Sequence, residues 1–260
     1  PECVGWKLVA VNLSDLAAKG ATPTAALLSL TLTGDGAWEA AFIDGIEAAC
    51  ERHQLPLIGG DTIALPPGAA RVLGMTAIGK AGPKVPSRGG GEPSDRLWLV
   101  GAVGNSAAGL AQLRHDEGAT GALVEAYRRP VPLLEAGQAL APHANAMLDI
   151  SDGLLIDALR LAEASGCIAA IDLGAIGLSP AFVAVRGDSL EARLFAASGG
   201  DDYALLAALP QGIDPAALDL PSGTPIACVG TLEHGPGALT LSNHGQAVAL
   251  PRRLGHEHDC

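Results

Sequence analysis

The sequence predicts an α/β protein with two domains, each built from interleaved helices and strands. Its 260 residues, 48% of them hydrophobic, are enough for one large domain or two of ordinary size. Strand-like apolar segments alternate with helical segments in both halves, which favours two α/β units. Between the halves, residues 81–95 are dense in glycine and proline, as is typical of a connection. We therefore expect domains at 1–82 and 94–260, joined by a linker at 83–93.

The first half contains the predicted elements of the N-terminal domain. Residues Val4–Lys19 are apolar on almost every side and stop at Gly20, which predicts a helix with a glycine terminator. After it, the sequence predicts a strand at Ala25–Thr33, a helix at Trp38–His53, a short buried strand at Leu55–Ile58 that runs into Gly59–Thr62, and a strand at Val72–Gly79.

The second half starts a new series of elements. A strand at Leu97–Val100 and a glycine-rich turn at Gly101–Gly104 lead into a helix. A further helix at Asp152–Ser165 is expected to be capped by Ser151 and ended by Gly166. The remaining predicted elements are helical stretches on both sides of Arg128–Pro130, a helix at Leu190–Ala197, strands at Met147–Ile150, Ile168–Leu173, Tyr203–Leu209 and Ile226–Gly230, and weaker strands near Ala238 and Ala247.

The composition restricts the classes of partner and the compartment. A formal net charge of −12 gives a surface that repels nucleic acid and anionic lipid, so we expect neither as a partner. No apolar run reaches the ~18–20 residues that span a membrane, and no charged-then-apolar leader opens the chain, which predicts a cytoplasmic protein. The five cysteines are odd in number and form no C-x-x-C pair, which favours reduced thiols over a disulfide framework or a zinc site.

Four short segments place carboxylates beside glycine or at the end of a predicted element. Mg²⁺ prefers oxygen ligands and shares them between carboxylates and substrate phosphates. Carboxylates from several elements, with glycine beside them to let the backbone approach a phosphate, are therefore the ingredients of a magnesium–phosphate site. The segments are Asn12–Asp15, Gly59–Thr62, Asp149–Gly153 and Gly199–Tyr203.

The first two segments also have structural explanations. Asp15 lies four residues before Lys19, the spacing of an ordinary surface ion pair on a helix. Because the rest of that helix is apolar, a functional role for Asp15 is slightly favoured. Asp61 follows a predicted strand, where a carboxylate is also common as a turn residue.

The last two segments have structural explanations as well. Asp149 and Asp152 flank a helix start, where the helix dipole favours carboxylates whatever their function. Gly153 in the first turn is costly unless something comes close to it. Asp201 and Asp202, entering a strand, would point to opposite faces, so at most one serves a given cleft and the other is structural.

Missing motifs argue against P-loop enzymes, dinucleotide-binding enzymes and serine hydrolases. The sequence has no G-x-x-x-x-G-K-[ST] loop, and the glycines of residues 101–109 do not have G-x-G-x-x-G spacing. It also lacks H-E-x-x-H and the nucleophile elbow of serine hydrolases. The run His256–His258 is more typical of a frayed tail than of a ligand set.

In this order, the four carboxylate segments resemble the thiamine-monophosphate kinase family. The stretches "PSRGGGEPSDRLWLVGAVGNSAAGL" and "RRPVPLLEAGQAL" are also similar, so the resemblance covers nearly the whole chain. The D-x-S-D-G and Gly-Gly-Asp elements are shared with a wider superfamily that includes aminoimidazole ribonucleotide synthetase, whereas "NLSDLAA" is more specific. The segments that carry the resemblance are "VNLSDLAAKGATP" (Val11–Pro23), "LIGGDT" (Leu57–Thr62), "MLDISDGLLIDALRLAEASG" (Met147–Gly166) and "SGGDDYALL" (Ser198–Leu206).

The resemblance implies an architecture, an activity and a set of site residues. It implies an N-terminal sheet-plus-helix domain that forms a homodimer, a C-terminal α/β domain, and a cleft between them for ATP and several Mg²⁺ ions. The implied reaction is ATP-dependent phosphorylation of thiamine monophosphate to thiamine diphosphate. By position, Asp15, Asp61, Asp149 and Asp152 are implied as catalytic magnesium ligands, Gly60, Asp61, Arg88 and Ser151 as ATP contacts, and Asp201 and His256 as substrate contacts.

The chain departs from the family pattern in three places. The family begins with a further segment that carries more metal ligands and a substrate-facing histidine, and this chain starts after it, at Pro1. His256 lies near the place of a substrate-stacking aromatic, and Ala204 replaces the usual acidic residue after Tyr203. Two alternatives remain open: another ATP-dependent enzyme of the superfamily with a different small acceptor, and a catalytically inactive paralogue that binds nucleotide or serves as a dimerising scaffold.

The implied chemistry requires positioning rather than proton transfer. The acceptor phosphate is already ionised at neutral pH, so no general base is needed. The difficulty is to bring two polyanions together in line, which charge neutralisation and positioning must overcome. We expect direct transfer without a phosphoenzyme.

Overall fold

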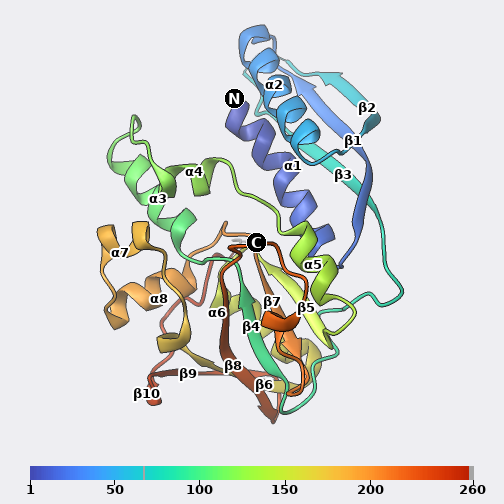
Figure 1. Ribbon diagram of the computed structural model, residues 1–260. Helices are drawn as coiled ribbons and strands as arrows, with labels where there is room; N and C mark the ends of the chain where they lie inside the picture. Colours follow the sequence, from blue (N-terminus) through green and yellow to red (C-terminus); the bar gives the residue numbers. More distant parts are fainter. Residues whose placement is uncertain (67, 258–260) are drawn as a thin grey trace.

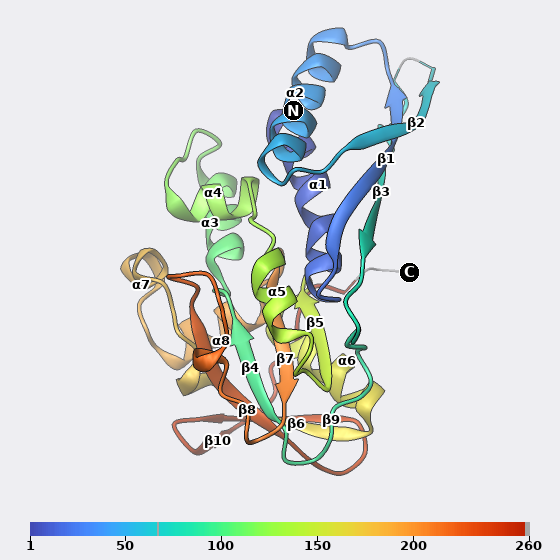
Figure 2. The same ribbon diagram turned by 45° about the vertical axis from the view of Figure 1, so that its right-hand side comes forward.

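The computed structural model describes residues 1–66 and 68–257 and confirms the mixed α/β class. Helices and strands form two separate sheets, one of three strands and one of seven. The small sheet and two long helices lie at one end of the molecule, and the large sheet lies at the other (Figures 1 and 2). A single extended connection leads from the last strand of the small sheet to the first strand of the large one.

The N-terminal elements form a sheet covered on one face by two helices. These elements are α1 (Glu2–Ala17), β1 (Thr22–Leu32), α2 (Gly36–Arg52), β2 (Leu57–Ala64) and β3 (Leu73–Lys80). The strand order is β2-β1-β3, with β1 parallel to β2 and antiparallel to β3. Ala26 and Leu28 of β1 are buried among Val9, Leu13 and Phe42 of the two helices, while Leu27 between them faces outward.

The predicted short buried strand at Leu55–Ile58 is wrong in two respects. The observed strand β2 begins later and runs through Gly59–Thr62, and every one of its residues is exposed. Helix α1 packs on β1 and β3 rather than on β2, so this edge strand has no helix over it. Only Leu55, which precedes the strand, joins the core.

The C-terminal elements form a seven-stranded sheet in the order β10-β9-β6-β8-β4-β7-β5. Most neighbouring strands are antiparallel, and β6 and β9 are parallel. The elements are β4 (Arg96–Val100), α3 (Asn105–His115), α4 (Ala122–Arg128), α5 (Leu134–Leu140), β5 (Ala146–Ile150), α6 (Leu154–Ser165), β6 (Cys167–Asp172), the 3₁₀ turn η1 (Leu173–Ala175), α7 (Pro180–Arg186), α8 (Leu190–Ser198), β7 (Ala204–Leu209), the 3₁₀ turn η2 (Pro215–Ala217), β8 (Ile226–His234), β9 (Ala238–Asn243) and β10 (Gln246–Val248).

Helix α1 connects the two parts of the molecule. On one face of the large sheet, α6 supplies buried residues such as Leu155 and Leu161. On the other face, Leu140 of α5 packs on β5 and β7 together with Ala17 and Ala18 at the end of α1. The first part of α1 belongs to the small core and its last turn to the large one, so the side chains of this helix are presented to both.

Two helices differ from the prediction. Helix α6 begins at Leu154, with Gly153 rather than Ser151 at the N-cap position, and ends at Gly166 as predicted. Helix α7 was not predicted, although Ser179 accepts a hydrogen bond from the Phe182 amide and Pro180 opens the helix, which is a recognisable start signal.

Two further features concern the described residues. None of their helices is both long and apolar enough to pass through a membrane. Cys3, Cys50, Cys167 and Cys228 are free thiols, while Cys260 lies outside the described residues.

Candidate functional site

The turn that follows β5 (residues 151–153) and the turn that precedes β7 (residues 199–203) are hydrogen-bonded to each other. The amide of Asp201 donates to the carbonyl of Ser151 at 2.7 Å, and the amide of Tyr203 donates to the carbonyl of Ile150 at 2.9 Å. Gly153, with φ of +133°, has the carbonyl of Ser198 within 3.0 Å of where a Cβ would lie. The close neighbour that this glycine requires is therefore the protein's own backbone.

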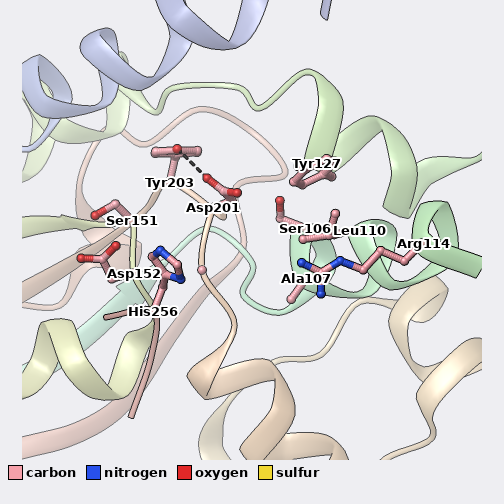
Figure 3. Close-up of a pocket in the computed structure, with 11 residues that line it drawn as sticks. Ser106, Ala107, Leu110, Arg114, Tyr127, Ser151, Asp152, Asp201, Tyr203 and His256 are labelled. Atoms are coloured by element: carbon pink, nitrogen blue, oxygen red, sulfur yellow. Dashed lines mark hydrogen bonds between the residues drawn. The ribbon is translucent and has the colours of Figure 1, made fainter. Parts of the chain in front are cut away.

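These turns form one side of a pocket of about 520 Å³ (Figure 3). Helices α3 and α4 form the other side, and the C-terminal segment closes it. Ser151, Asp152, Asp201 and His256, four of the predicted site residues, line this pocket. The full lining is Ser106, Ala107, Leu110, Arg114, Tyr127, Ser151, Asp152, Gly200, Asp201, Tyr203 and His256.

His256 is held against the pocket, and the prediction of a frayed tail is wrong for it. Its amide donates to the carbonyl of Asp152 at 2.8 Å. A Cβ on the preceding Gly255 would overlap that carbonyl and the side chain of Ile156, so the segment lies directly on the start of α6. His258 lies outside the described residues.

Asp201 is fixed at the pocket wall by two side chains. Its Oδ2 lies 3.0 Å from the ammonium of Lys7 on α1, and its Oδ1 accepts a hydrogen bond from the Tyr203 hydroxyl at 2.8 Å. Asp201 and Tyr203 both have positive φ, at +68° and +54°. Non-glycine residues rarely adopt this conformation, and the residues that do are often found at functional sites. Burial, followed by the Asp201 charge, raises the pKa of Tyr203.

Asp202 does not line the pocket, and its side chain lies at the start of helix α3. The two aspartates lie in the turn before β7 rather than in the strand. The Asp202 carboxylate accepts hydrogen bonds from the amides of Gly104, at 2.6 Å, and Ser106, at 3.0 Å. Burial raises its pKa to about 7, and the two amide hydrogen bonds oppose that rise. Asp202 is thus a structural residue, while its neighbour Asp201 lines the pocket.

A second polar cluster lies where the end of α1 meets the end of β5. The Ser14 hydroxyl donates to Asp149 Oδ2 at 2.7 Å. Burial raises the pKa of Asp149 to about 6; the Ser14 hydrogen bond opposes this rise, and the nearby charge of Asp15 adds to it. Burial and the charge of Arg88 lower the pKa of Lys19, while Asp149 and Asp15 act in the opposite direction. Two carboxylates and two cations therefore lie within electrostatic range of one another.

The alternative explanation of Asp15, a surface ion pair with Lys19, does not hold. Among residues 1–66 and 68–257, no ion pair joins the two. The Lys19 ammonium instead lies 3.4 Å from the carbonyl of Pro86, in the glycine-rich connection. Arg88, in the same connection, is exposed. The connection thus supplies a cation opposite the end of α1.

Asp152 is tied to the first turns of α6. Arg160 Nη1 lies 2.6 Å from Asp152 and 2.8 Å from Asp157. Asp157 also accepts hydrogen bonds from the amides of Asp152 and Gly153, which satisfies the start of the helix in place of the predicted Ser151 cap. Burial raises the pKa of Asp157, and its hydrogen bonds oppose that rise.

Gly60 and Asp61 lie apart from the other predicted site residues. Asp61 is opposite Ser29 in the parallel register of β2 and β1, so it shares the outward face of the small sheet, whereas α1 packs on the inner face. Asp61 is exposed and accepts a hydrogen bond from the Thr62 amide. The structure therefore brings Asp15 near Asp149 but does not bring Asp61 to them, and the assignments of Gly60 and Asp61 stay predictions.

The donor set fits magnesium that is shared with phosphate groups. Among the described residues, no group of three or more His, Cys, Asp or Glu side chains could hold a metal ion by itself. Mg²⁺ commonly uses only one or two carboxylates and takes its other ligands from phosphates and water. Asp149, whose pKa is raised by burial and by Asp15, is a carboxylate that a cation would stabilise. With Lys19 and Arg88 nearby to attract phosphates, the cluster suits a metal–nucleotide complex better than a bare ion.

The sequence analysis missed several residues of the site. Lys7 is the only charged residue in the otherwise apolar run from Cys3 to Val11, and Tyr127, one of two tyrosines in the chain, lies opposite it with its ring centroid 4.0 Å from the Lys7 ammonium. Arg160 and Asp157 lie one turn or more beyond the recognised Asp152. A lysine alone in an apolar run was the available signal for Lys7, whereas the contacts of Tyr127 join distant segments and have no local signature.

Comparison with protein families matches two models that together cover most of the chain. Residues 1–81 match the AIR synthase related protein, N-terminal domain. Residues 92–237 match the AIR synthase related protein, C-terminal domain.

Several thiamine-monophosphate kinases are similar to this chain over almost its full length. The thiamine-monophosphate kinase of Salmonella typhimurium is 36% identical over 267 residues, covering 99% of this chain and 80% of that protein. The thiamine-monophosphate kinase of Caulobacter vibrioides is 34% identical, covering 99% of this chain and 74% of that protein.

Solved structures of the same kind superpose closely. Thiamine-monophosphate kinase from Stenotrophomonas maltophilia has a TM-score of 0.80 and 32% identity, covering 95% of this chain and 80% of that one. AaThiL complexed with AMPPCP and TMP has a TM-score of 0.82 and 29% identity, covering 99% and 81%. The hydrogenase maturation protein HypE in complex with ATP shares the fold, with a TM-score of 0.78 and 19% identity.

Proposed function

Because this chain belongs to the thiamine-monophosphate kinase family, and is therefore a kinase, we propose that it transfers the γ-phosphoryl group of ATP to thiamine monophosphate and forms thiamine diphosphate. The observation that carries this proposal is the pocket lined by Ser151, Asp152 and Asp201, which lies directly beside the cluster of Asp149 and Asp15. A relative of the same fold has been solved with AMPPCP, a methylene analogue of ATP, and with TMP. The proposed place of reaction is the cytoplasm, as the sequence predicts.

The two parts of the site suit the two substrates. The pocket offers an aromatic ring, Tyr127, and a carboxylate, Asp201, which suit an aromatic cation such as the acceptor's thiazolium ring. The cluster offers Lys19 and Arg88 as positive charges for phosphates. Asp149, near the end of β5, and Asp152, in the turn before α6, connect the two parts, and we place the phosphate ends of both substrates beside them.

The residues of this chain act by positioning and by charge. Asp149 and Asp15, with Asp152 and the more distant Asp61, are proposed to hold magnesium, which when bound supplies neutralising charge to the phosphate oxygens. Arg88 and Lys19 add fixed positive charge, and Ser151 and Gly60 contact the nucleotide. Asp201 and His256 orient the acceptor so that its ionised phosphate oxygen faces the γ-phosphorus in line. The acceptor oxygen is already ionised and needs no base, and we propose that transfer is direct, without a phosphoenzyme.

Two features of the assembly belong to the proposal. ATP binds between residues 1–82 and residues 94–260, which we propose to be the two domains of the protein. The protein forms a homodimer through the small sheet, whose outward face carries exposed apolar side chains such as Leu27, Ile63 and Ile78.

The test is a coupled assay of ADP release with purified protein, Mg-ATP and thiamine monophosphate, with thiamine diphosphate measured by chromatography. We expect one thiamine diphosphate for each ADP. Turnover with a different small acceptor, and none with thiamine monophosphate, would assign the chain to another reaction of the superfamily. ATP binding without turnover of any acceptor would identify an inactive paralogue.

A further inference from the structure

A positive charge from α1 lies between an acidic and an aromatic side chain of the pocket. The Lys7 ammonium is 3.0 Å from Asp201 Oδ2 and 4.0 Å from the centroid of the Tyr127 ring. Asp201 and Tyr127 both line the pocket of Figure 3, from opposite sides. Lys7 reaches them from α1, where it lines a neighbouring groove with Val4, Leu8 and Tyr127 itself. The ammonium thus lies at the boundary between that groove and the pocket, in contact with two pocket residues, in a place that another cation could take.

The chemistry of this place matches the acceptor. A carboxylate beside the face of an aromatic ring attracts organic cations, above all planar or quaternary ones. The acceptor under the proposed function carries a permanently positive thiazolium ring. We propose that Lys7 fills the acceptor's cation subsite in the ligand-free protein as an internal substitute, and that thiamine monophosphate must displace it to bind. This inference rests on the proposed function and adds the residue that sets acceptor affinity.

The surrounding contacts let Lys7 leave without disturbing Asp201. The Tyr203 hydroxyl holds the other oxygen of Asp201 at 2.8 Å, and the amide of Asp201 is bonded to Ser151. The side chains of Lys7 and Asp201 are 22% and 37% exposed, and ion pairs at that exposure are weak. The Lys7 stem has the apolar groove of α1 to lie in while its ammonium turns to water.

This role predicts an effect with the opposite sign to that of an ordinary binding residue. A subsite that is blocked for part of the time lowers apparent affinity by the fraction in which it is open. Removing the Lys7 charge should therefore tighten acceptor binding. If Lys7 instead contacted the acceptor's phosphate or oriented Asp201, its removal would weaken binding.

The experiment compares Lys7→Met and Lys7→Arg with the parent by titration calorimetry and steady-state kinetics. The ligands are thiamine monophosphate and its analogue in which a neutral thiophene ring replaces the thiazolium. For Lys7→Met we expect Kd and KM for thiamine monophosphate to fall about three- to tenfold with kcat unchanged, because only the blocked state is removed. The neutral analogue must displace Lys7 to enter the same place, so its Kd should fall by a similar factor in Lys7→Met. Lys7→Arg keeps the competing cation and should resemble the parent.

A matched control is Arg129→Met. Arg129 also joins this region to α1, with its guanidinium 3.5 Å from Glu2 and 5.7 Å from the Trp6 ring, but it lies outside the pocket. It should leave both Kd values unchanged. Pulse reductive methylation with mass spectrometry gives a second readout on the parent protein: thiamine monophosphate should increase the labelling of Lys7.

The outcomes separate this inference from the proposed function. Weaker binding or no change in Lys7→Met, or protection of Lys7 from methylation, overturns the inference while turnover by the parent upholds the proposed function. A parent that neither binds nor phosphorylates thiamine monophosphate overturns both.

Discussion

Asp149 is a buried carboxylate whose environment disfavours its charge. Its pKa is raised from 3.8 to about 6, chiefly by burial. The folded state therefore holds the proton more tightly than the unfolded chain does. The resulting stabilisation is fully present below pH 4 and is lost as the pH rises through about 6, which leaves a cost of roughly 2–3 kcal/mol at neutral pH. A bound cation would remove that cost.

Asp149→Asn should therefore stabilise the metal-free protein at pH 7.5 by roughly 1–3 kcal/mol, since the amide oxygen can still accept from Ser14. The gain should shrink as the pH falls below about 6, and stabilisation by Mg-ATP should be lost. Thermal melts from pH 4.5 to 8 in EDTA, repeated at pH 7.5 with saturating Mg-ATP, measure both effects. Asp44→Asn, an exposed change on α2, is the control. A less stable Asp149→Asn protein at pH 7.5 would show that the charge is already paired.

Asp202→Ala tests the structural member of the adjacent aspartates. It leaves the amides of Gly104 and Ser106 without their acceptor at the start of α3, and we expect a loss of about 1–3 kcal/mol in the free energy of unfolding. Chemical denaturation measures it, with Asp116→Ala, an exposed turn carboxylate at the other end of α3, as the control. The shift in melting temperature caused by Mg-ATP should persist. If that shift disappears while the apo stability is unchanged, Asp202 serves the ligand.

At this scale, the sequence identified carboxylates but not their partners. Asp149, Asp152 and Asp201 stand beside glycines or element ends, which is a local signal. Lys7 pairs with Asp201 across 194 positions of the chain, and no local pattern encodes such a contact. The sequence indicated that some group approaches Gly153 closely but not which one, and the structure shows that it is the carbonyl of Ser198.

At the scale of elements, helices α1 and α2 cross at two glycines. A Cβ on Gly45 would overlap the backbone carbonyl of Glu2, and a Cβ on Gly5 would overlap that of Phe42. No flexible side chain can move aside at either place, so the helix axes approach closely only because these residues lack a Cβ.

Gly45→Ala should accordingly destabilise the protein by about 1–3 kcal/mol or more, despite the better helix propensity of alanine. Gly36→Ala, at the start of the same helix and with nothing within 4 Å of its Cβ, should be neutral or slightly stabilising. Urea denaturation of the two variants decides the matter. Equal stability would mean that the helices can separate without cost.

The elements also show what periodicity can and cannot predict. Helices and strands with clear stop signals, such as α6 before Gly166, lie close to their predicted ranges. Strand β2 was misjudged because its apolar residues suggest burial, and whether a helix covers an edge strand depends on packing between distant segments. Helix α7 was missed because seven residues are too few for a period to emerge.

At the scale of the molecule, the net charge of −12 and the carboxylates of the site should make ATP binding depend on Mg²⁺. Titration calorimetry should show binding of Mg-ATP and a loss of at least about tenfold in affinity in EDTA. Equal affinity in both buffers would eliminate a metal shared between carboxylates and phosphates.

The outward face of the small sheet carries the prediction about assembly. Ile78 is 43% exposed on β3, and a C₂ dimer would bury it against its own copy. Light scattering at micromolar concentration should give the mass of a dimer for the parent and for Val185→Glu, an equally apolar exposed site on α7, and of a monomer for Ile78→Glu. A monomeric parent would remove the basis of this assignment.

Helix α1 carries Lys7 at the acceptor pocket and Ser14 and Asp15 at the phosphate cluster. Lys7 and Asp15 are eight residues apart, which places them about 12 Å apart along one rigid helix. When the acceptor displaces Lys7, it removes a contact between α1 and the pocket. A nucleotide that binds at Asp15 acts on the other end of the same helix. The two binding events are then thermodynamically linked: if the acceptor changes the affinity for the nucleotide by some factor, the nucleotide changes the affinity for the acceptor by the same factor.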